Sequence, residues 1–436
     1  MKHVIIGNSA AGIGAVEGIR AAEAALSADK QSEITIITNE AHHTYSRPLI
    51  SYLLPGKVTE ESIKYRGENF YAENNVTLLA NVNVIKIDAE KKQVILSDNS
   101  GVPYDKLLVA AGSSPFVPPF EGLDTVKNKV TFMSLDDARR LDSMLTDFSD
   151  KKNGAKVLII GAGLIGLKCA EGIVKRAPEI TVVDLAPRIL SSILDDDGAK
   201  IIQDHIEKQG IKFKLASSVK KFDVNSALFE NGDSVNFDIL VLAVGVRPNT
   251  SLLKDIAAID RGIIVNEKSE TSAKDIYAAG DCTQTLDVSS GQNKIMALLP
   301  NAYMQGECAG INMAANAPER QTAGEKSFDK AIPMNAIGFF GLHIITAGNY
   351  SGEIYLMKNE ESAAKNYKKL FYSDNKLNGY ILIGNVEKAG IYTSLIRERT
   401  PLDTIDFPLV CKKPGLMAFT KEERKKKLGG VLPRIT

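Results

Sequence analysis

The 436-residue sequence has only four cysteines, and none of them stands in a CxxC or CxxxxC spacing. Cysteines scattered in this way form no recognisable iron–sulfur or zinc site, and they do not have the pattern of a secreted disulfide framework. The sequence therefore predicts that this chain holds no metal of its own.

A surplus of charge and a long apolar run are missing as well. Lysine and arginine together number 53, as do aspartate and glutamate. This balance excludes a broad basic surface for nucleic acid, although a local patch is compatible with it. No apolar run reaches the roughly 20 residues that span a bilayer, and the N-terminus passes directly into a strand-like run that leaves no room for a signal peptide. These absences predict a cytoplasmic protein that binds neither nucleic acid nor membrane.

The composition that is present is that of a globular protein. Hydrophobic residues make up 44% of the chain and charged residues 24%, which is ordinary for a folded protein and too apolar for disorder. At roughly 150 residues per domain, the length predicts about three domains.

One βαβ pattern occurs twice, with its two copies about 150 residues apart. Each copy runs from an apolar strand through a glycine-containing turn and a helix to a β-branched strand. The copies cover residues 2–37 and 156–184, and the second helix is expected to reach about Arg176. Strand, glycine turn, helix and strand in this order are typical of a parallel sheet. We therefore predict an α/β protein with two Rossmann-like, three-layer nucleotide-binding domains.

The second turn carries the full dinucleotide fingerprint, with Gly161, Gly163 and Gly166. Glycines at a strand–helix turn let the backbone approach a pyrophosphate closely, while the helix N-terminus supplies amide donors and partial positive charge. Asp184 ends the next strand, 23 positions after Gly161. A carboxylate there accepts hydrogen bonds from ribose hydroxyls and repels a 2′-phosphate, so NADH is predicted over NADPH. The rest of the predicted NAD site is Leu164, Ile165, Arg188, Val244 and Gly245.

The first turn departs from the fingerprint at its middle glycine. Ser9 stands there, which adds a Cβ near the phosphate path but also a hydroxyl donor. The usual acidic ribose partner is replaced by Thr38, and Glu40 is the nearest substitute. The predicted nucleotide-binding residues of this copy are Gly7, Ser9, Ala10, Ala11, Gly12 and Glu40.

With both turns in view, the chain resembles the two-dinucleotide-binding-domain flavoproteins, which have the pyridine nucleotide–disulfide oxidoreductase fold, over about residues 1–330. The resemblance also rests on the turns Ala111-Gly112 and Val244-Gly245 and on the stretch 271–281, which is similar to the family's second FAD motif. It implies that FAD and NAD are the cofactors and that Asp281 binds the ribityl and pyrophosphate part of FAD. The other residues that it adds to the FAD site are Arg47, Val84, Ala111, Gly112 and Ala302.

The resemblance also implies the domain boundaries. The FAD-binding domain is expected at 1–114 and 246–328, and the NAD-binding domain at 115–245. A C-terminal α+β interface domain with a basic tail is expected at 329–436. Within it, short alternating runs broken by glycines and a turn signal at 374–379 predict an antiparallel sheet.

The loop from His42 to Tyr52 decides the branch of the family. Peroxide and oxidase members carry a cysteine here, and Pro48 occupies about that position. Proline has no nucleophile, so thiol relay at the flavin is excluded in this register. The sequence Tyr-Ser-Arg-Pro is similar to the corresponding sequence of NADH:rubredoxin oxidoreductases, ferredoxin reductases and the flavin part of assimilatory nitrite reductases. The resemblance implies electron transfer between NAD(H) and a one-electron carrier through FAD.

Two charged residues are flavin-proximal candidates together with Pro48. Arg47 either neutralises the reduced flavin or meets an acidic partner; alternatively, it is a surface arginine anchored by Tyr45. Lys168 stands where many relatives have a glutamate that pairs with a lysine near the flavin, and here Tyr52 replaces that lysine. Either Lys168 lies near the flavin alone or it turns to solvent.

The C-terminal part is similar to the interface domain of flavin subunits in ferredoxin-linked complexes. The implied partners are ferredoxin, rubredoxin or an iron–sulfur subunit, and the domain is also a candidate surface for homo- or hetero-oligomers. The basic tail at 421–427 is either a solvated face or a docking site for an acidic ferredoxin. The alternatives are a stand-alone NADH oxidase or small-molecule reductase, and a non-catalytic flavin-bearing subunit.

Overall fold

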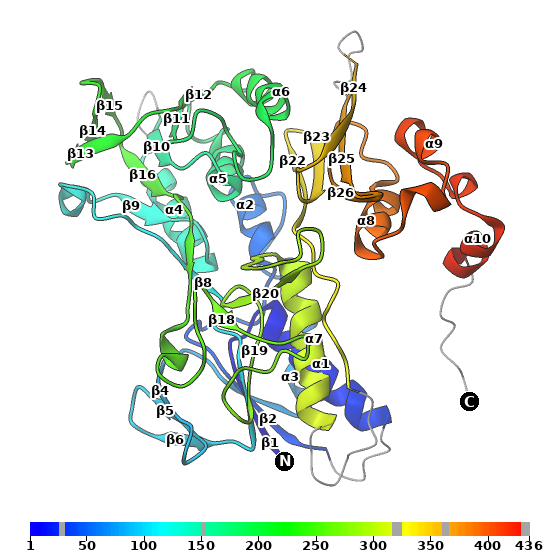
Figure 1. Ribbon diagram of the computed structural model, residues 1–436. Coiled ribbons are helices and arrows are strands. Elements are labelled where there is room, and N and C mark those ends of the chain that lie inside the picture. Colours follow the sequence, from blue (N-terminus) through cyan, green and yellow to red (C-terminus); the bar gives the residue numbers. More distant parts are fainter. Residues whose placement is uncertain (26–30, 150–153, 316–324, 360–365, 429–436) are drawn as a thin grey trace. The chain divides into compact units, whose positions relative to one another are not determined.

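The computed structural model describes residues 1–25, 31–149, 154–315, 325–359 and 366–428 (Figure 1). The chain divides into two compact units. The first contains Met1–Thr285 and Asn293–Asp329, and the second contains Leu286–Gln292 and Lys330–Thr436.

The first unit begins with a five-stranded parallel sheet in the order β19-β7-β1-β2-β3. Its strands are β1 Lys2–Ile6, β2 Glu33–Ile37, β3 Val76–Leu79, β7 Lys106–Val109 and β19 Ile276–Ala278. Residues before 110 therefore share one sheet with a strand from the region after 270. The buried β1 and β7 are almost continuously apolar, as strands of a sheet covered on both faces must be.

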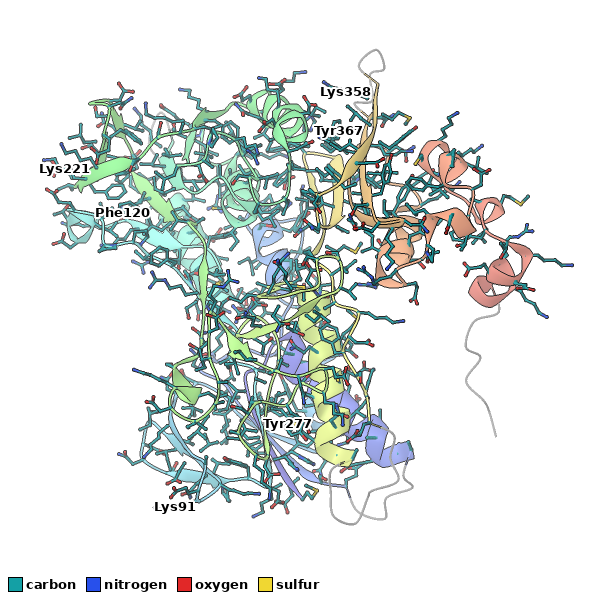
Figure 2. The ribbon with its side chains drawn as sticks, viewed as in Figure 1. Lys91, Phe120, Lys221, Tyr277, Lys358 and Tyr367 are labelled. Carbon is teal, nitrogen blue, oxygen red and sulfur yellow. The ribbon has the colours of Figure 1, made fainter. Side chains whose placement is uncertain are left out.

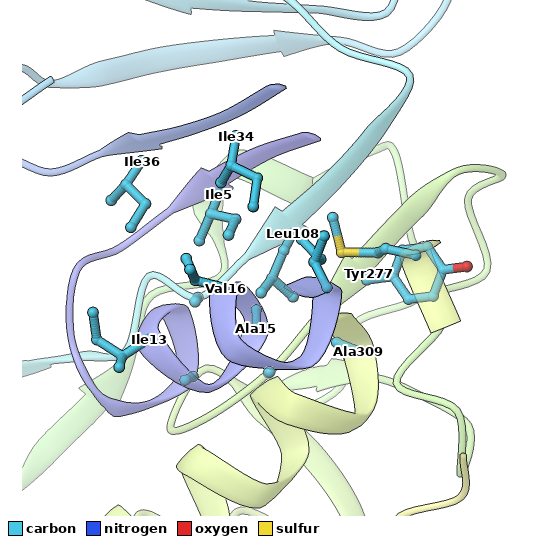
Figure 3. Packing of buried hydrophobic residues seen from close by; sticks show 14 of the residues in the cluster. Ile5, Ile13, Ala15, Val16, Ile34, Ile36, Leu108, Tyr277 and Ala309 are labelled. Atoms are coloured by element: carbon cyan, nitrogen blue, oxygen red, sulfur yellow. The ribbon is translucent and has the colours of Figure 1, made fainter. Parts of the chain in front are cut away.

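Two helices pack on each other beside this sheet, α1 Ala10–Ala25 and α7 Leu299–Ala315. Glycines bring their backbones into contact, because a Cβ on Gly306 would lie 2.0 Å from the Ala11 carbonyl oxygen and one on Gly310 would lie 2.1 Å from that of Ala15. Figure 3 shows Ala15 of α1 and Ala309 of α7 in the core with Ile5 of β1. The two helices form one layer against the sheet.

A second five-stranded parallel sheet in this unit has the order β12-β11-β10-β16-β9. Its strands are β9 Lys129–Thr131, β10 Lys156–Ile160, β11 Glu179–Val183, β12 Ile211–Lys214 and β16 Ile239–Leu242, and its helices are α4 Leu135–Asp147, α5 Leu164–Ile173 and α6 Asp196–Glu207. Helix α5 ends three residues before the predicted Arg176, because residues 174–176 close the helix as a turn in which the Arg176 amide donates to the Ile173 carbonyl.

An antiparallel sheet of β13 Val219–Asp223, β14 Ser226–Phe229 and β15 Ser234–Asn236 accompanies the second parallel sheet. Phe120 packs edge-on against Phe222 of β13, with 5.3 Å between ring centroids. Figure 2 labels Phe120 and the neighbouring Lys221. The proline-containing connections that follow β7 and β16 also pair with each other, as β8 Ser113–Pro115 and β17 Val246–Pro248. The sequence did not predict this ribbon.

The remaining elements of the chain before residue 330 are short. They are β4 Val84–Asp88, β5 Gln93–Leu96, β6 Gly101–Pro103, β18 Ile263–Ile264, β20 Thr283–Asp287, β21 Gln292–Lys294, α2 Ile50–Leu53, α3 Phe70–Glu73 and the 3₁₀ turns η1 Arg47–Leu49, η2 Leu123–Thr125 and η3 Ser251–Leu253.

The second unit has a five-stranded antiparallel sheet in the order β22-β23-β26-β25-β24. Its elements are β22 Met334–Phe339, β23 Leu342–Gly348, β24 Glu353–Asn359, β25 Asn366–Ser373, β26 Lys376–Ile383, α8 Ala389–Arg397, η4 Leu402–Thr404, α9 Phe407–Lys412, η5 Leu416–Ala418 and α10 Lys421–Leu428. Asp374 and Asn375 join β25 to β26 with φ of 49° and 59°, the left-handed backbone of a tight hairpin. Two parallel sheets and this antiparallel sheet confirm the predicted fold class. Among the described residues, no helix is long and apolar enough to cross a membrane.

Candidate functional site

The first glycine turn, between β1 and α1, is possible only with glycine at two positions. Gly7 has φ of 119°, and a Cβ there would lie 2.1 Å from the Ala110 carbonyl oxygen. A Cβ on Gly12 would lie 2.0 Å from the Gly7 carbonyl oxygen. Ser9 precedes the helix, and Ala10 and Ala11 begin it. The first amides of α1 thus have no intrahelical partner and suit an anionic pyrophosphate.

Two distant chain segments meet this turn. Gly280 has φ of 83°, and a Cβ on it would lie 3.2 Å from the Ala11 Cβ and 3.5 Å from the Ala302 Cβ. Asp281 follows Gly280 directly, so the structure brings the second predicted FAD motif, the α1 turn and the start of α7 together. Val84 is different, because it starts β4 and packs in the apolar cluster with Leu96.

Asp281 is a partly buried carboxylate, and burial raises its pKa. The Ser113 hydroxyl donates to it at 3.1 Å. This hydrogen bond and the charge of Arg47 act to lower the pKa. Ser113 follows the predicted Ala111-Gly112 turn, where Gly112 has φ of 64°. Sequence reasoning missed Ser113. Its position directly after Gly112 was the available signal.

Several buried polar atoms around the glycine turn between β1 and α1 lack a hydrogen-bond partner among the described residues. They are Thr44 Oγ1, His43 Nε2 and Gln305 Nε2. The other amide atom of Gln305, Oε1, accepts from the Gly280 amide at 2.8 Å, so this side chain is fixed beside the Asp281 motif. A buried polar atom without a partner is costly, and a polar ligand such as FAD relieves that cost. The residues present therefore fit FAD.

Glu40, the predicted ribose partner, is already engaged. The Tyr45 hydroxyl donates to its Oε2 at 2.8 Å, and the Arg47 guanidinium pairs with its Oε1. Arg47 also donates to the Met133 carbonyl at 3.2 Å, and Tyr45 accepts from the Leu135 amide at 3.0 Å. A carboxylate has about four lone-pair sites, so Glu40 can still accept a ribose hydroxyl. Arg47 is anchored by Tyr45, as one of its two interpretations requires, while its charge also acts on Asp281.

Pro48 is exposed and stands in the first turn of η1. The four cysteines, by contrast, are all buried. Burial raises the pKa of Cys282 to about 12 and those of Cys308 and Cys411 to about 11, and it raises the pKa of Cys169 as well. None of these thiols forms the thiolate that a redox relay requires at neutral pH.

The second glycine turn repeats the geometry of the first. Gly161 has φ of 113°, and a Cβ there would lie 2.2 Å from the Ala243 carbonyl oxygen. A Cβ on Gly166 would lie 2.0 Å from the Gly161 carbonyl oxygen, whereas one on Gly163 would have nothing within 4 Å. The open side of Gly163 lies where α5 begins with Leu164 and Ile165, which is the cradle that a dinucleotide pyrophosphate needs.

Asp184 already holds the loop around this cradle. Its Oδ2 accepts from the Ala162 amide at 2.6 Å and its Oδ1 from the Ala186 amide at 2.8 Å. Each oxygen retains a lone pair for a ribose hydroxyl, so the residues also fit NAD. Arg188 turns toward α6, where it pairs with Asp196 at 3.1 Å. The turn at Val244-Gly245 has φ of 122° at Gly245, whose carbonyl accepts from the Phe116 amide.

Lys168 is not turned to solvent, so that alternative is wrong. Its side chain is 18% exposed and forms an ion pair with Glu171. Its ammonium lies 3.2 Å from the Tyr52 hydroxyl oxygen and 4.6 Å from the centre of the Tyr52 ring. Sequence reasoning missed Glu171, although its spacing of three residues from Lys168 on a helix was a signal.

The face of α5 that carries Lys168 also lies against the loop from His42 to Tyr52, which we call the flavin loop, through its backbone. A Cβ on Gly172 would lie 2.6 Å from the Ser51 carbonyl oxygen of α2. Helix α5 therefore connects the predicted NAD turn at its N-terminus with the loop that carries Arg47 and Pro48. In the described part of the chain, no group of three or more His, Cys, Asp or Glu side chains could hold a metal ion.

Two protein-family models match the chain. The model described as pyridine nucleotide-disulphide oxidoreductase matches residues 1–306, and the model described as the rubredoxin NAD+ reductase C-terminal domain matches residues 333–400. Together they account for both of the parallel sheets and for most of the C-terminal antiparallel domain.

Curated relatives match nearly the whole chain. The NADH-dependent phenylglyoxylate dehydrogenase subunit epsilon of Aromatoleum evansii is 30% identical over 410 residues, which cover 92% of each chain. The NADH-rubredoxin oxidoreductase of Clostridium acetobutylicum is 28% identical over 377 residues, which cover 85% of this chain and 89% of that protein.

A solved structure shares the fold. A chain of the covalent putidaredoxin reductase–putidaredoxin complex superposes with a TM-score of 0.82 at 23% identity, over 94% of this chain and 96% of that one. At this identity the likeness concerns the fold alone.

Proposed function

Because the chain belongs to the pyridine nucleotide-disulphide oxidoreductase family, we propose that it is the NADH-dependent flavoprotein that exchanges electrons with an iron–sulfur protein. Its cofactors are FAD and NAD(H). When bound, FAD supplies the exchange between two-electron and one-electron transfer. The observation that carries the proposal is the exposed Pro48 in a flavin loop without a thiol, because electrons that cannot pass through a disulfide leave by another carrier.

In the proposed FAD site, the residues act as binding and orienting groups. The glycine turn at 7–12 admits the pyrophosphate to the amides of α1, and Asp281 accepts from ribityl hydroxyls. The pKa of Asp281 is raised by burial, so hydroxyl donors that hydrogen-bond to its charged form offset part of that cost. Arg47 contributes positive charge on the same side, held in place by Glu40 and Tyr45.

In the proposed NAD site, Asp184 selects the coenzyme. Two backbone amides fix its carboxylate, so it presents a preorganised acceptor to a ribose and a negative charge to a 2′-phosphate. The open side of Gly163 admits the pyrophosphate. Helix α5 then ties this cradle to the flavin loop through Lys168 and Gly172.

The finer part of the proposal is the partner. The name of the Aromatoleum relative is that of a dehydrogenase subunit, and that of the Clostridium relative includes rubredoxin. We take the partner of this chain to be an iron–sulfur protein or subunit and the location to be the cytoplasm, where buried free thiols stay reduced.

The test is a comparison of electron acceptors for the purified protein loaded with FAD. NADH should bleach the flavin, and a ferredoxin or rubredoxin should then be reduced much faster than glutathione disulfide, coenzyme A disulfide or peroxide. Asp281→Ala should lose FAD on dialysis, whereas Asp88→Ala, at an acidic residue of the surface strand β4, should retain it. Fast turnover with oxygen and none with either iron–sulfur protein would refute the proposal in favour of a stand-alone oxidase.

A further inference from the structure

The residues beyond the second family match form a structured part of the C-terminal unit. That match ends at residue 400, and the segment from Phe407 to Leu428 follows with α9, η5 and α10, drawn in red in Figure 1. We call it the docking segment. It is firmly attached to its own unit, because Val410 and Phe419 are buried in the core and the Asp406 amide donates to the Ala418 carbonyl at 2.9 Å.

Three large apolar side chains of the docking segment are exposed. Met417 is 77% exposed, and Leu409 and Leu416 are 38% and 37% exposed. The Arg424 guanidinium lies 3.4 Å from the Met417 sulfur, so a cation borders the exposed methionine. Methionine is adaptable at binding surfaces, and an apolar centre with a charged rim is the usual anatomy of a protein interface.

The charge of the docking segment is strongly one-sided. It contains seven lysines and arginines and two glutamates, although positive and negative residues balance over the whole chain at 53 each. Lys412, Lys413, Lys421 and Lys425 are exposed. Two such faces repel each other, which argues against a symmetric contact with a second copy of this chain. Helix α10 has a single apolar residue, Leu428, which argues against a helix lying in a membrane interface.

We propose that the docking segment binds an acidic iron–sulfur protein, with Met417 at the centre of the contact and the four exposed lysines named above and Arg424 around it. This inference rests on the proposed function and adds the surface that recognises the partner. Complementary charge of this kind steers the encounter of two proteins, and it does so less as salt rises because exposed charges are screened within about 10 Å at 0.1 M ionic strength.

The probe is a bacterial two-cluster ferredoxin of net negative charge, used with the full-length FAD-loaded protein. The docking variant is Lys421→Glu with Arg424→Glu and Lys425→Glu. The control variant, Lys91→Glu with Lys127→Glu and Lys220→Glu, makes the same change in net charge at exposed lysines of the first unit. We expect kcat/KM for ferredoxin to fall about tenfold or more at low salt in the docking variant alone, with a flattened salt dependence. Met417→Ser should lower it at every salt concentration.

Two readouts separate this inference from the proposed function. One is the reduction of the flavin by NADH, and the other is the reduction of ferricyanide by the NADH-reduced protein. Both should stay unchanged in the docking variant. If the wild type reduces ferricyanide but neither ferredoxin nor rubredoxin, the proposed function is wrong. If ferredoxin is reduced equally by the docking and control variants, the docking surface is wrong and the function stands. A third outcome would assign the segment to a membrane surface instead. In it, the wild type binds phosphatidylglycerol vesicles and the docking variant does not, while the kinetics with ferredoxin are the same for both proteins.

Discussion

Gly172 is the point at which helix α5 meets the flavin loop, and Gly172→Ala should disturb electron transfer more than stability. The added Cβ would lie 2.6 Å from the Ser51 carbonyl oxygen, against at least 3.4 Å in an ordinary contact. The helix and the loop must therefore separate by about 0.8 Å, since a backbone oxygen cannot rotate away. A displacement of this size between reacting groups lowers rates by about tenfold to a hundredfold.

The effect on folding should be small, because two terms oppose each other. Overpacking costs about 1–3 kcal/mol, whereas alanine in a helix interior is about 1 kcal/mol better than glycine. We thus expect a free energy of unfolding within about 2 kcal/mol of the wild type and an unchanged FAD content.

The assay is stopped-flow bleaching of the flavin by saturating NADH, with the FAD content and urea unfolding measured on the same samples. Gly390→Ala is the matched control, because it also lies in a helix and its Cβ would have nothing within 4 Å. It should leave the bleaching rate unchanged. A Gly172→Ala rate within twofold of the wild type would show that the spacing of α5 and the loop does not govern the reaction.

Three further variants test separate residues. We expect the protein to prefer NADH over NADPH by at least about tenfold in kcat/KM, or about 1.4 kcal/mol, and Asp184→Ala should narrow this preference. An unchanged ratio of the two rates in stopped-flow reduction would show that this carboxylate does not select the coenzyme. Burial lowers the pKa of His3 from 6.5 to about 4. As the pH falls, His3 therefore takes up a proton in the unfolded chain before it does so in the folded protein. Up to about 3 kcal/mol of the free energy of unfolding is then lost between pH 6.5 and 4. His3→Leu should remove that loss, and equal drops in the urea midpoint of both proteins from pH 7.5 to 5 would contradict the assignment. Replacement of all four cysteines by alanine should leave flavin bleaching by NADH within about twofold once circular dichroism confirms folding, and a large loss would mean that a thiol takes part.

The glycine turns could be predicted from the sequence because their constraints are local. Gly7 and Gly161 have positive φ, and a Cβ at Gly12 or Gly166 would meet the carbonyl of the turn itself. A short stretch of sequence therefore carries the whole requirement. The parallel sheets follow for the same reason, since apolar runs beside such turns have few other ways to be buried.

Apart from the contact of Arg47 with the nearby Tyr45, the partners of the charged residues could not be predicted, because they depend on long-range packing. Glu40 is held by Tyr45 and Arg47, and Arg47 also contacts Met133, 86 positions away. Lys168 meets Tyr52 across 116 positions. One sequence gives the residue types at these positions but not which of the many charged and aromatic side chains will be neighbours. The prediction for Lys168 accordingly left two positions open, and its contact with Tyr52 excludes the solvent-facing one.

The backbone contact between α1 and α7 has a consequence for the order in which the protein forms during synthesis. Helix α1 ends at Ala25, but the glycines that receive it lie on α7, which begins at Leu299. The ribosome therefore completes every strand of the second parallel sheet before the first sheet gains β19 and α1 gains its neighbour. Contacts between distant segments form late and leave apolar surface exposed in the meantime. The nucleotide turn that comes first along this sequence is thus among the last parts of its unit to be completed. A nascent chain stopped short of α7 should therefore depend on chaperones.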